Sequence, residues 1–379
     1  MKKNLLLTPG PTQIPANICA VLGQPIIHHR TPQFQAILKE VTEGLKYIFQ
    51  TKNDIFILTS SGTGAMEAAV CNLLSPGDKA ITVECGKFGE RWGELCKVYG
   101  IQANIVKVPW GKAVDAAQIQ KILDSDKNIK AVFITLSETS TGVDTNVKAL
   151  GEVVKKSNAV LIVDAISGLG AVDLQTDNWG VDVVVSGSQK GLMLPPGLAF
   201  ISVSTKALAL VEKSTCPKYY FSLKKAKKAA DQTDTPFTPA IGIVIALNES
   251  LKMMKDEGLE KLFARYLKLA KGVKAAAKAL GLKLYADDSC ASGAVTAICV
   301  PDGIDGKKFV KTMRDIHGVT MAGGQAELEG KIFRICHMGC IDEYDILTGI
   351  ACVEKVLKEM GYKFELGAGL AAAQKVFNS

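Results

Sequence analysis

Between residues 54 and 200 the sequence alternates apolar runs with segments of helical periodicity, and this alternation restricts the fold more than any other feature. The apolar runs are short and rich in Val, Ile and Leu, and they fall at 54–59, 79–84, 103–108, 131–136, 159–164 and 181–186. Most intervals place apolar residues three and four apart, for example at 63–74 and 146–157. Apolar strands joined by helices predict a parallel sheet covered on both faces. Functional loops are then expected at the carboxyl ends of the strands.

The C-terminal part of the chain predicts a smaller unit that mixes helices and strands. Its patterns follow in the order helix, helix, strand, helix, strand, helix at 239–255, 257–281, 294–300, 306–317, 331–336 and 344–360. The boundary with the preceding unit is expected between residues 255 and 285. A Gly/Ala-rich segment at 367–373 is the only compositionally biased stretch.

Length and composition fit a globular protein. The 379 residues suffice for a large α/β domain with a smaller one, and 47% are apolar and 22% charged. The net charge of +7 is modest and spread along predicted helices, so nucleic-acid binding is not expected. No apolar run approaches the ~18 residues of a membrane span, and the leucines near the N-terminus are too few for a signal peptide.

The cysteines point to a reducing compartment. The sequence has ten cysteines and no CxxC pair, which favours reduced thiols in a cytoplasmic protein. Cys336, His337 and Cys340 lie close in sequence, but a zinc site needs a second ligand pair. No metal is therefore expected.

Small residues gather where the first apolar run meets a helix. Residues 60–64 read Ser-Ser-Gly-Thr-Gly, and such a helix start leaves backbone N–H groups free to bind phosphate with the help of the helix dipole. A tight strand-to-helix turn without a ligand explains the same residues. The segment matches neither a Walker loop nor a GxGxxG fingerprint.

Two charged residues follow later apolar runs. Asp164 closes the run 159–164, where a helix cap, a core salt bridge or the protonated ring nitrogen of a cofactor would satisfy it. Lys190 follows the run 181–186 and is either a lysine that reaches solvent or an amine held for covalent chemistry. Together with the phosphate cradle, these residues form the set that pyridoxal 5′-phosphate (PLP) needs: a Schiff-base lysine, a carboxylate for the ring nitrogen and a helix start for the phosphate.

With these motifs the chain resembles the class V aminotransferases of PLP fold type I, and within them the alanine/serine–glyoxylate (serine–pyruvate) group. The likeness runs from "LLLTPGPTQIP" through "SSGTGAMEAAV", "SETSTGV", "IVDAISGLG" and "SGSQKGLMLPPG" to "FRICHMG". It implies an α/β fold with a mostly parallel seven-stranded sheet flanked by helices, plus a smaller C-terminal α+β domain. The implied division is an N-terminal arm (1–20), a large PLP-binding domain (21–260) and a small domain (261–379), in a homodimer with active sites at the interface.

The resemblance also implies roles for individual residues. Lys190 would form the Schiff base and carry the proton, and Asp164 would pair with the pyridine nitrogen. Other cofactor-binding residues would be Ser61, Gly62, Thr63, Phe88, Thr139, Gln189 and Thr238. Gly10 and Arg334 would contact the substrate, with Arg334 gripping its carboxylate through two hydrogen bonds. A structural ion pair is the alternative for an arginine in an apolar strand.

Some positions depart from the pattern of the group. Phe88 stands where the group stacks an aromatic residue, often Trp, on the ring, so the indole N–H is lost. Thr238 matches a residue that reaches the phosphate of the partner subunit, whereas Thr235 replaces an aromatic residue. The segment 28–30, His-His-Arg, has no assigned role and fits an interface, an entrance or a surface loop.

Transamination is the expected reaction among the chemistries of the class. Cysteine desulfurases typically carry His before the lysine and a mobile reactive cysteine, whereas Gln189 precedes Lys190 here. The expected reaction is ping-pong, with alanine or serine as donor and glyoxylate or pyruvate as acceptor. The alternatives are a 2-aminoethylphosphonate–pyruvate or ureidoglycine–glyoxylate transaminase and a non-catalytic subunit, since close homologues have been labelled soluble hydrogenase subunits. No metal-ligand pattern supports that label.

Overall fold

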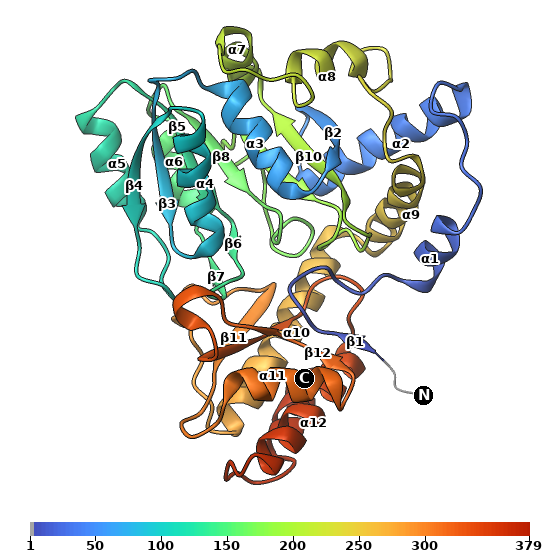
Figure 1. The fold of residues 1–379 in the computed structure, drawn as a ribbon, viewed down its shortest axis with the longest axis vertical. Helices are drawn as coiled ribbons and strands as arrows, with labels where there is room; N and C mark the ends of the chain where they lie inside the picture. Colours follow the sequence, from blue (N-terminus) through green and yellow to red (C-terminus); the bar gives the residue numbers. More distant parts are fainter. Residues whose placement is uncertain (1–3) are drawn as a thin grey trace.

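The computed structural model describes residues 4–379 and is built around a seven-stranded sheet (Figure 1). The strand order is β2-β10-β9-β8-β5-β3-β4. The strands are β2 Asp54–Ser60, β3 Lys79–Glu84, β4 Gln102–Lys107, β5 Ile129–Thr135, β8 Val160–Asp164, β9 Val183–Gly187 and β10 Gly197–Val203. Only β10 runs antiparallel to its neighbours, and the other paired strands are parallel. This confirms the predicted mostly parallel sheet and adds β10, which directly follows Pro195-Pro196 and lies outside the six predicted runs.

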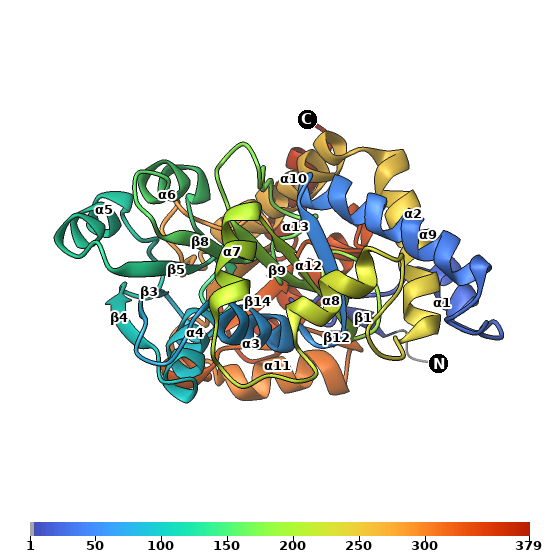
Figure 2. The same ribbon diagram turned by 90° about the horizontal axis from the view of Figure 1, so that it is seen from above.

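Helices cover both faces of this sheet, as Figure 2 shows. Alternate residues of β5 enter two separate cores, with Phe133 in one and Ile134 in the other. The Phe133 core is closed by α3 Gly62–Leu73, α4 Lys87–Val98, α7 Thr205–Lys213 and α8 Leu223–Ala230. The Ile134 core is closed by α2 Pro32–Phe49, α5 Ala116–Ser125, α6 Val147–Val154 and α9 Ile241–Glu257. Burial on both sides explains why the strands read as near-continuous apolar runs.

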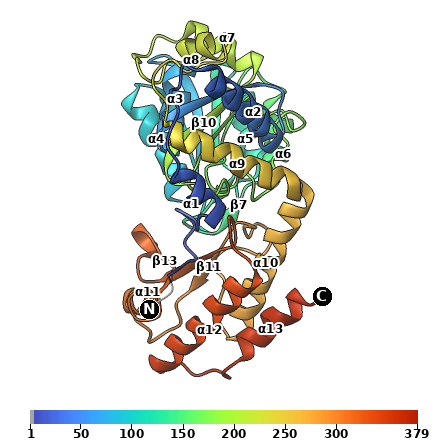
Figure 3. The same ribbon diagram turned by 90° about the vertical axis from the view of Figure 1, so that its right-hand side faces the viewer.

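The C-terminal part forms a second, smaller layer. Its sheet has the antiparallel order β11-β14-β13. The elements are α10 Leu259–Ala279, β11 Val295–Cys299, α11 Gly306–Asp315, β12 Val319–Thr320, β13 Ala322–Gly323, β14 Ile332–Cys336, α12 Glu343–Glu359 and α13 Ala368–Phe377. Figure 3 shows α10 leading away from the large sheet toward α12 and α13. The Gly/Ala-rich segment forms the N-cap and first turns of α13. This helix packs on α10, where Gly272 leaves room for the Phe377 ring.

The N-terminal segment connects the two layers. Strand β1 (Leu5–Leu6) pairs with β12 of the smaller layer, and the chain then passes the large sheet before α1 (Ala16–Leu22). The Thr12 N–H donates to the Gln189 carbonyl at 3.1 Å. The segment between β1 and α1 is thereby fixed against the loop that carries Lys190. In residues 4–379 no helix is both long and apolar enough to cross a membrane.

Candidate active site

Strands β2, β9, β8 and β5 end at the same edge of the large sheet. Strand β10 begins between the ends of β2 and β9, with Gly197 opposite Ser60 and Ala199 opposite Gly187, while Thr135 pairs with Asp164. A cavity of about 310 Å³ lies at this edge. It is lined by residues that the sequence predicted separately, namely Gly10, Ser61, Gly62, Thr63, Phe88, Asp164, Gln189 and Lys190. The topology therefore brings most of the predicted site residues together.

Lys190 lies in the loop between β9 and β10 and is held by the N-terminal segment. Its side-chain nitrogen donates to the Pro9 carbonyl, and the Thr12 hydroxyl donates to the Lys190 carbonyl at 2.8 Å. Burial, with the nearby positive charges of Arg334 and Arg91, lowers the pKa of Lys190 to about 8. A neutral amine is thus accessible near neutral pH, as a nucleophile or proton carrier requires.

Asp164 is the last residue of β8 and is only 3% exposed. Its carboxylate accepts the Ile166 N–H at 2.8 Å and makes no ion pair with any residue in the described part of the chain. Burial, reinforced by the negative charge of Glu138, raises the pKa of Asp164 to about 7. A buried carboxylate in this state is stabilised by a ligand that brings a positive charge or a proton.

The start of α3 forms one wall of the cavity. Ser61 is the N-cap of α3, but its side chain makes no capping hydrogen bond. A β-carbon at Gly62 would overlap the Ile166 side chain. The free N–H groups of this first helical turn suit an anion. The Gln189 amide oxygen lies nearby and has no hydrogen-bond partner in residues 4–379.

Arg91 also lines the cavity, although the sequence had not indicated it. Its Nη1 donates to the Thr63 hydroxyl at 3.1 Å, and its guanidinium lies 5.2 Å from the centre of the Phe88 ring. Its spacing of three residues from Phe88 on α4 places both on one helix face, and this was the available signal. Within residues 4–379 Arg91 makes no ion pair with a carboxylate, so its charge remains available to an anion.

Arg334 lies in β14 of the smaller layer and is not among the residues that line the cavity, although its charge acts on Lys190. It is 5% exposed, and its Nε and Nη2 donate to the Gly323 carbonyl at 3.0 and 2.7 Å. Its Nη1 donates to the Thr139 carbonyl at 2.8 Å. Burial lowers the pKa of Arg334 to about 10. Its partners are carbonyls rather than a carboxylate, so the structural ion pair is not the arrangement found.

Thr139 lies beside the cavity without lining it. Its hydroxyl is buried and has no hydrogen-bond partner among residues 4–379. A buried hydroxyl without a partner costs free energy, about 1–3 kcal/mol. A ligand oxygen would relieve this cost.

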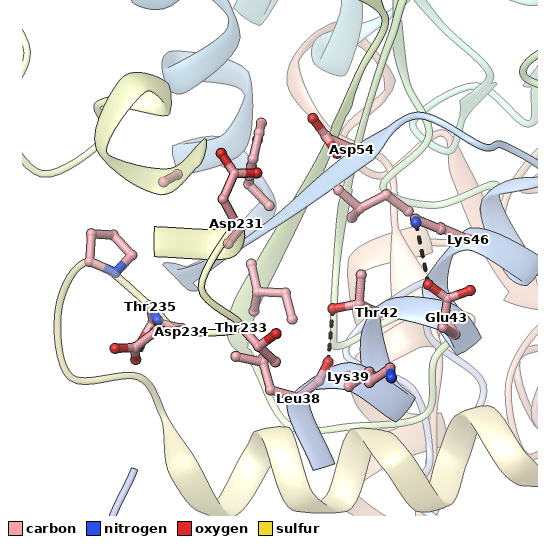
Figure 4. A pocket seen from close by; sticks show the side chains of 16 residues that line it. Leu38, Lys39, Thr42, Glu43, Lys46, Asp54, Asp231, Thr233, Asp234 and Thr235 are labelled. Atoms are coloured by element: carbon pink, nitrogen blue, oxygen red, sulfur yellow. Dashed lines mark hydrogen bonds and ion pairs between the residues drawn. The ribbon is translucent and has the colours of Figure 1, made fainter. Parts of the chain in front are cut away.

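Thr238 lies elsewhere, on the loop between α8 and α9. Its side chain is exposed and outside the Lys190 cavity of this chain. Thr235 lines a different cavity of about 210 Å³ between this loop and α2 (Figure 4). Arg30 of the His-His-Arg segment pairs with Asp234 of the same loop. A contact from Thr238 to a partner subunit stays a prediction.

His337 has a structural explanation. It is fully buried between the Thr296 hydroxyl at 2.8 Å and the Gly293 carbonyl at 3.1 Å. Burial lowers the pKa of His337 to about 3, so the ring is neutral. Within residues 4–379 no group of three or more His, Cys, Asp or Glu side chains is arranged to hold a metal.

Comparisons with known proteins agree with this geometry. The model of the family "Aminotransferase class-V" matches residues 11–331. The soluble hydrogenase small subunit of Synechococcus sp. (strain PCC 6716) is 45% identical over 100% of this chain and 99% of its own. The serine–glyoxylate aminotransferase of Hyphomicrobium methylovorum is 39% identical over 98% of this chain and 94% of its own. The crystal structure of ureidoglycine–glyoxylate aminotransferase from Bacillus subtilis superposes with a TM-score of 0.95 at 29% identity. The match covers 100% of this chain and 99% of that protein. The chain therefore belongs to the class V aminotransferase family and is a PLP-dependent transaminase of fold type I.

Proposed function

We propose that this transaminase moves an amino group from alanine or serine to glyoxylate or pyruvate in a ping-pong reaction at the Lys190 cavity. The observation that carries the proposal is the meeting of three groups in one cavity: the Lys190 amine, the unpaired Asp164 carboxylate and the free start of α3. Serine and glyoxylate in the names of similar proteins support the choice of a small donor and a small acceptor.

The residues present fit PLP. Within the described residues the buried Asp164 carboxylate makes no ion pair, and the pyridine nitrogen of PLP would supply one. The phosphate would be held by the start of α3, Thr63, Arg91 and the amide NH₂ of Gln189. The Phe88 ring would lie against the cofactor ring, and the Thr139 hydroxyl would gain a partner. PLP supplies the electron sink for the reaction when it is bound.

The other steps belong to side chains of this chain. Lys190 would hold the cofactor covalently through Nζ until the amino donor takes its place. The released amine, with its lowered pKa, would then remove the proton from the substrate α-carbon. Asp164 would keep the ring nitrogen protonated. Arg334 is held in place by the Gly323 and Thr139 carbonyls and would bind the substrate carboxylate by its forked guanidinium.

The proposal extends to the assembly. We infer a homodimer in which Thr238 of one chain approaches the cavity of the other, and this is compatible with its exposed position outside its own cavity. We also propose the division into an arm (1–20), a large domain (21–260) and a small domain (261–379). The ten free cysteines are compatible with a cytoplasmic location.

The test is a titration of the purified, PLP-loaded protein with L-alanine, L-serine and 2-aminoethylphosphonate in turn, followed by the absorbance of the bound cofactor. Alanine or serine should convert the cofactor, and glyoxylate or pyruvate should restore it. Conversion by 2-aminoethylphosphonate alone would reassign the substrate. Failure of every amine to convert the cofactor would favour the non-catalytic subunit to which the hydrogenase name points.

A further inference from the structure

Glu138 is a buried carboxylate beside the site with no role in the reaction proposed above. It lies in β6 (Ser137–Glu138), in the turn that leads to β7 (Val143–Asp144), and its exposure is 0%. Its Oε1 accepts the Ser140 N–H at 3.2 Å and the Ser140 hydroxyl at 2.5 Å. Its Oε2 accepts the N–H groups of Phe88 at 3.1 Å and Gly89 at 2.9 Å. Burial raises the pKa of Glu138, and the hydrogen bonds from Ser140, Gly89 and Phe88 oppose that shift because they favour the carboxylate.

The contacts with Phe88 and Gly89 cap α4 from a distant part of the chain. Gly86, the N-cap of α4, provides no side-chain bond, and a side chain there would overlap the Glu138 carboxylate. A negative charge at a helix N-terminus is favourable because it meets free N–H groups and the positive end of the dipole. Glu138 thus fixes the first turn of the helix that carries the Phe88 ring and Arg91.

The residue after Glu138 holds the other side of the site. Thr139 presents its carbonyl to Arg334 Nη1, and the negative charge of Glu138 favours the nearby guanidinium. Two consecutive residues therefore bond to the start of α4, which carries Phe88, and to Arg334 of the smaller layer. No other carboxylate of the described chain bonds to both the Phe88 and the Gly89 N–H.

We propose that Glu138 is a positioning residue that keeps Phe88 and Arg334 in register across the cofactor site. The inference rests on the proposed function, since it assumes that Phe88 faces the cofactor and that Arg334 faces the substrate carboxylate. A glutamine in place of Glu138 would present an amide NH₂ to at least one set of N–H donors. The start of α4 and the Thr139 carbonyl would then shift.

The experiment compares Glu138→Gln with a matched control, Glu354→Gln. Glu354 is also buried, at 2% exposure, and it also caps a helix from another element, accepting the Gly367 and Leu370 N–H groups at 2.6 and 3.0 Å. That helix, α13, lies away from the cavity. Both variants should lose thermal stability, so a general loss of packing is measured by the control.

Glu138→Gln should weaken PLP binding to the apoprotein, followed by fluorescence titration, by roughly tenfold or more, and should raise the KM for glyoxylate by a similar factor. Glu354→Gln should change neither quantity more than about twofold. Equal effects of the two variants on PLP affinity and KM would overturn the proposal. If Glu138→Gln does not fold, Ser140→Ala is the second variant. It removes the hydroxyl that donates to Glu138 and that also accepts the Lys87 N–H of α4 at 3.0 Å, so both quantities should shift in the same direction by a smaller factor. An unchanged Ser140→Ala protein would count against Glu138.

The two proposals can fail separately. Wild-type protein that does not transaminate any tested amine would contradict the proposed function, whereas the PLP titration would still compare the two variants. Active wild-type protein whose Glu138→Gln variant matches Glu354→Gln would contradict only the role of Glu138.

Discussion

The side-chain nitrogen of Lys190 donates a hydrogen bond to the carbonyl oxygen of Pro9, a residue 181 positions earlier in the chain. The Thr12 hydroxyl bonds to the Lys190 carbonyl from the same segment, and β1 just before it pairs with β12 of the smaller layer. The N-terminal segment thereby holds the lysine while it is anchored to the smaller layer. The position of the amine therefore depends on a segment that is also paired with the smaller layer.

Gly10 lies in the same segment, directly against the Lys190 side chain. It has φ +128°, and a β-carbon there would overlap the Lys190 ammonium. Gly10→Ala should therefore displace the lysine and reduce the rate of transamination by roughly 10²-fold, as misplacement of a reacting group does. Gly77→Ala is the control, since Gly77 also has a positive φ, +86°, but nothing lies within 4 Å of its added β-carbon. Equal kcat values for the two variants would refute the steric argument.

Lys190→Ala should abolish turnover because, in the proposed mechanism, Lys190 both binds the cofactor and carries the proton. The variant should retain its fold, as followed by circular dichroism, and should lose the visible absorbance of covalently held PLP. Lys39→Ala, at an exposed position of α2, should retain both properties. Turnover by Lys190→Ala near the wild-type rate would contradict the mechanism.

The sequence predicted the fold wherever burial left a clear apolar pattern. The parallel strands are apolar on both faces, so β5 and β8 were visible as runs and Asp164 and Lys190 as charges after them. β10 was not identified because prolines precede it. Arg91 and Glu138 were missed for another reason. Arg91 matters through its contact with Thr63, and Glu138 through its contact with the start of α4. Contacts between distant residues leave no periodic pattern in the sequence.

Arg91→Gln should weaken the binding of PLP by roughly tenfold because it removes a charge with no competing carboxylate partner in residues 4–379. The phosphate dependence is the diagnostic: pyridoxal without the phosphate should bind wild type and variant with equal affinity. Fluorescence titration of the apoproteins measures both ligands. A variant that loses affinity for pyridoxal as well would place Arg91 elsewhere than at the phosphate.

Arg334→Lys should raise the KM for glyoxylate by roughly 10–100-fold and leave kcat less affected. The lysine retains the charge but loses the fork that bonds to the Gly323 and Thr139 carbonyls and that, as we propose, binds the substrate carboxylate. Initial rates against glyoxylate concentration give both constants. An unchanged KM would assign the substrate carboxylate to a different group.

Asp164 makes the stability of the apoprotein depend on pH. Burial raises its pKa from 3.8 to about 7, so the folded protein binds a proton that the unfolded chain has released over this interval. The stability contributed by the protonated group is complete below pH 3.8 and is lost as pH rises through 7. The side chain in Asp164→Asn cannot titrate. Relative to this variant, the free energy of unfolding of the wild type should fall by on the order of 4 kcal/mol between pH 3.8 and about 7.

Urea unfolding of the wild-type and Asp164→Asn apoproteins across that pH range measures the difference in their free energies of unfolding. Addition of PLP above pH 7 should reduce the gap in free energy of unfolding between Asp164→Asn and wild type. The protonated ring nitrogen would stabilise the Asp164 carboxylate, whereas the asparagine variant has no carboxylate for it to bind. A gap that is independent of pH would show that Asp164 titrates at its ordinary pKa. A gap that depends on pH but does not respond to PLP would show that the carboxylate is buried as described and does not meet the ring nitrogen.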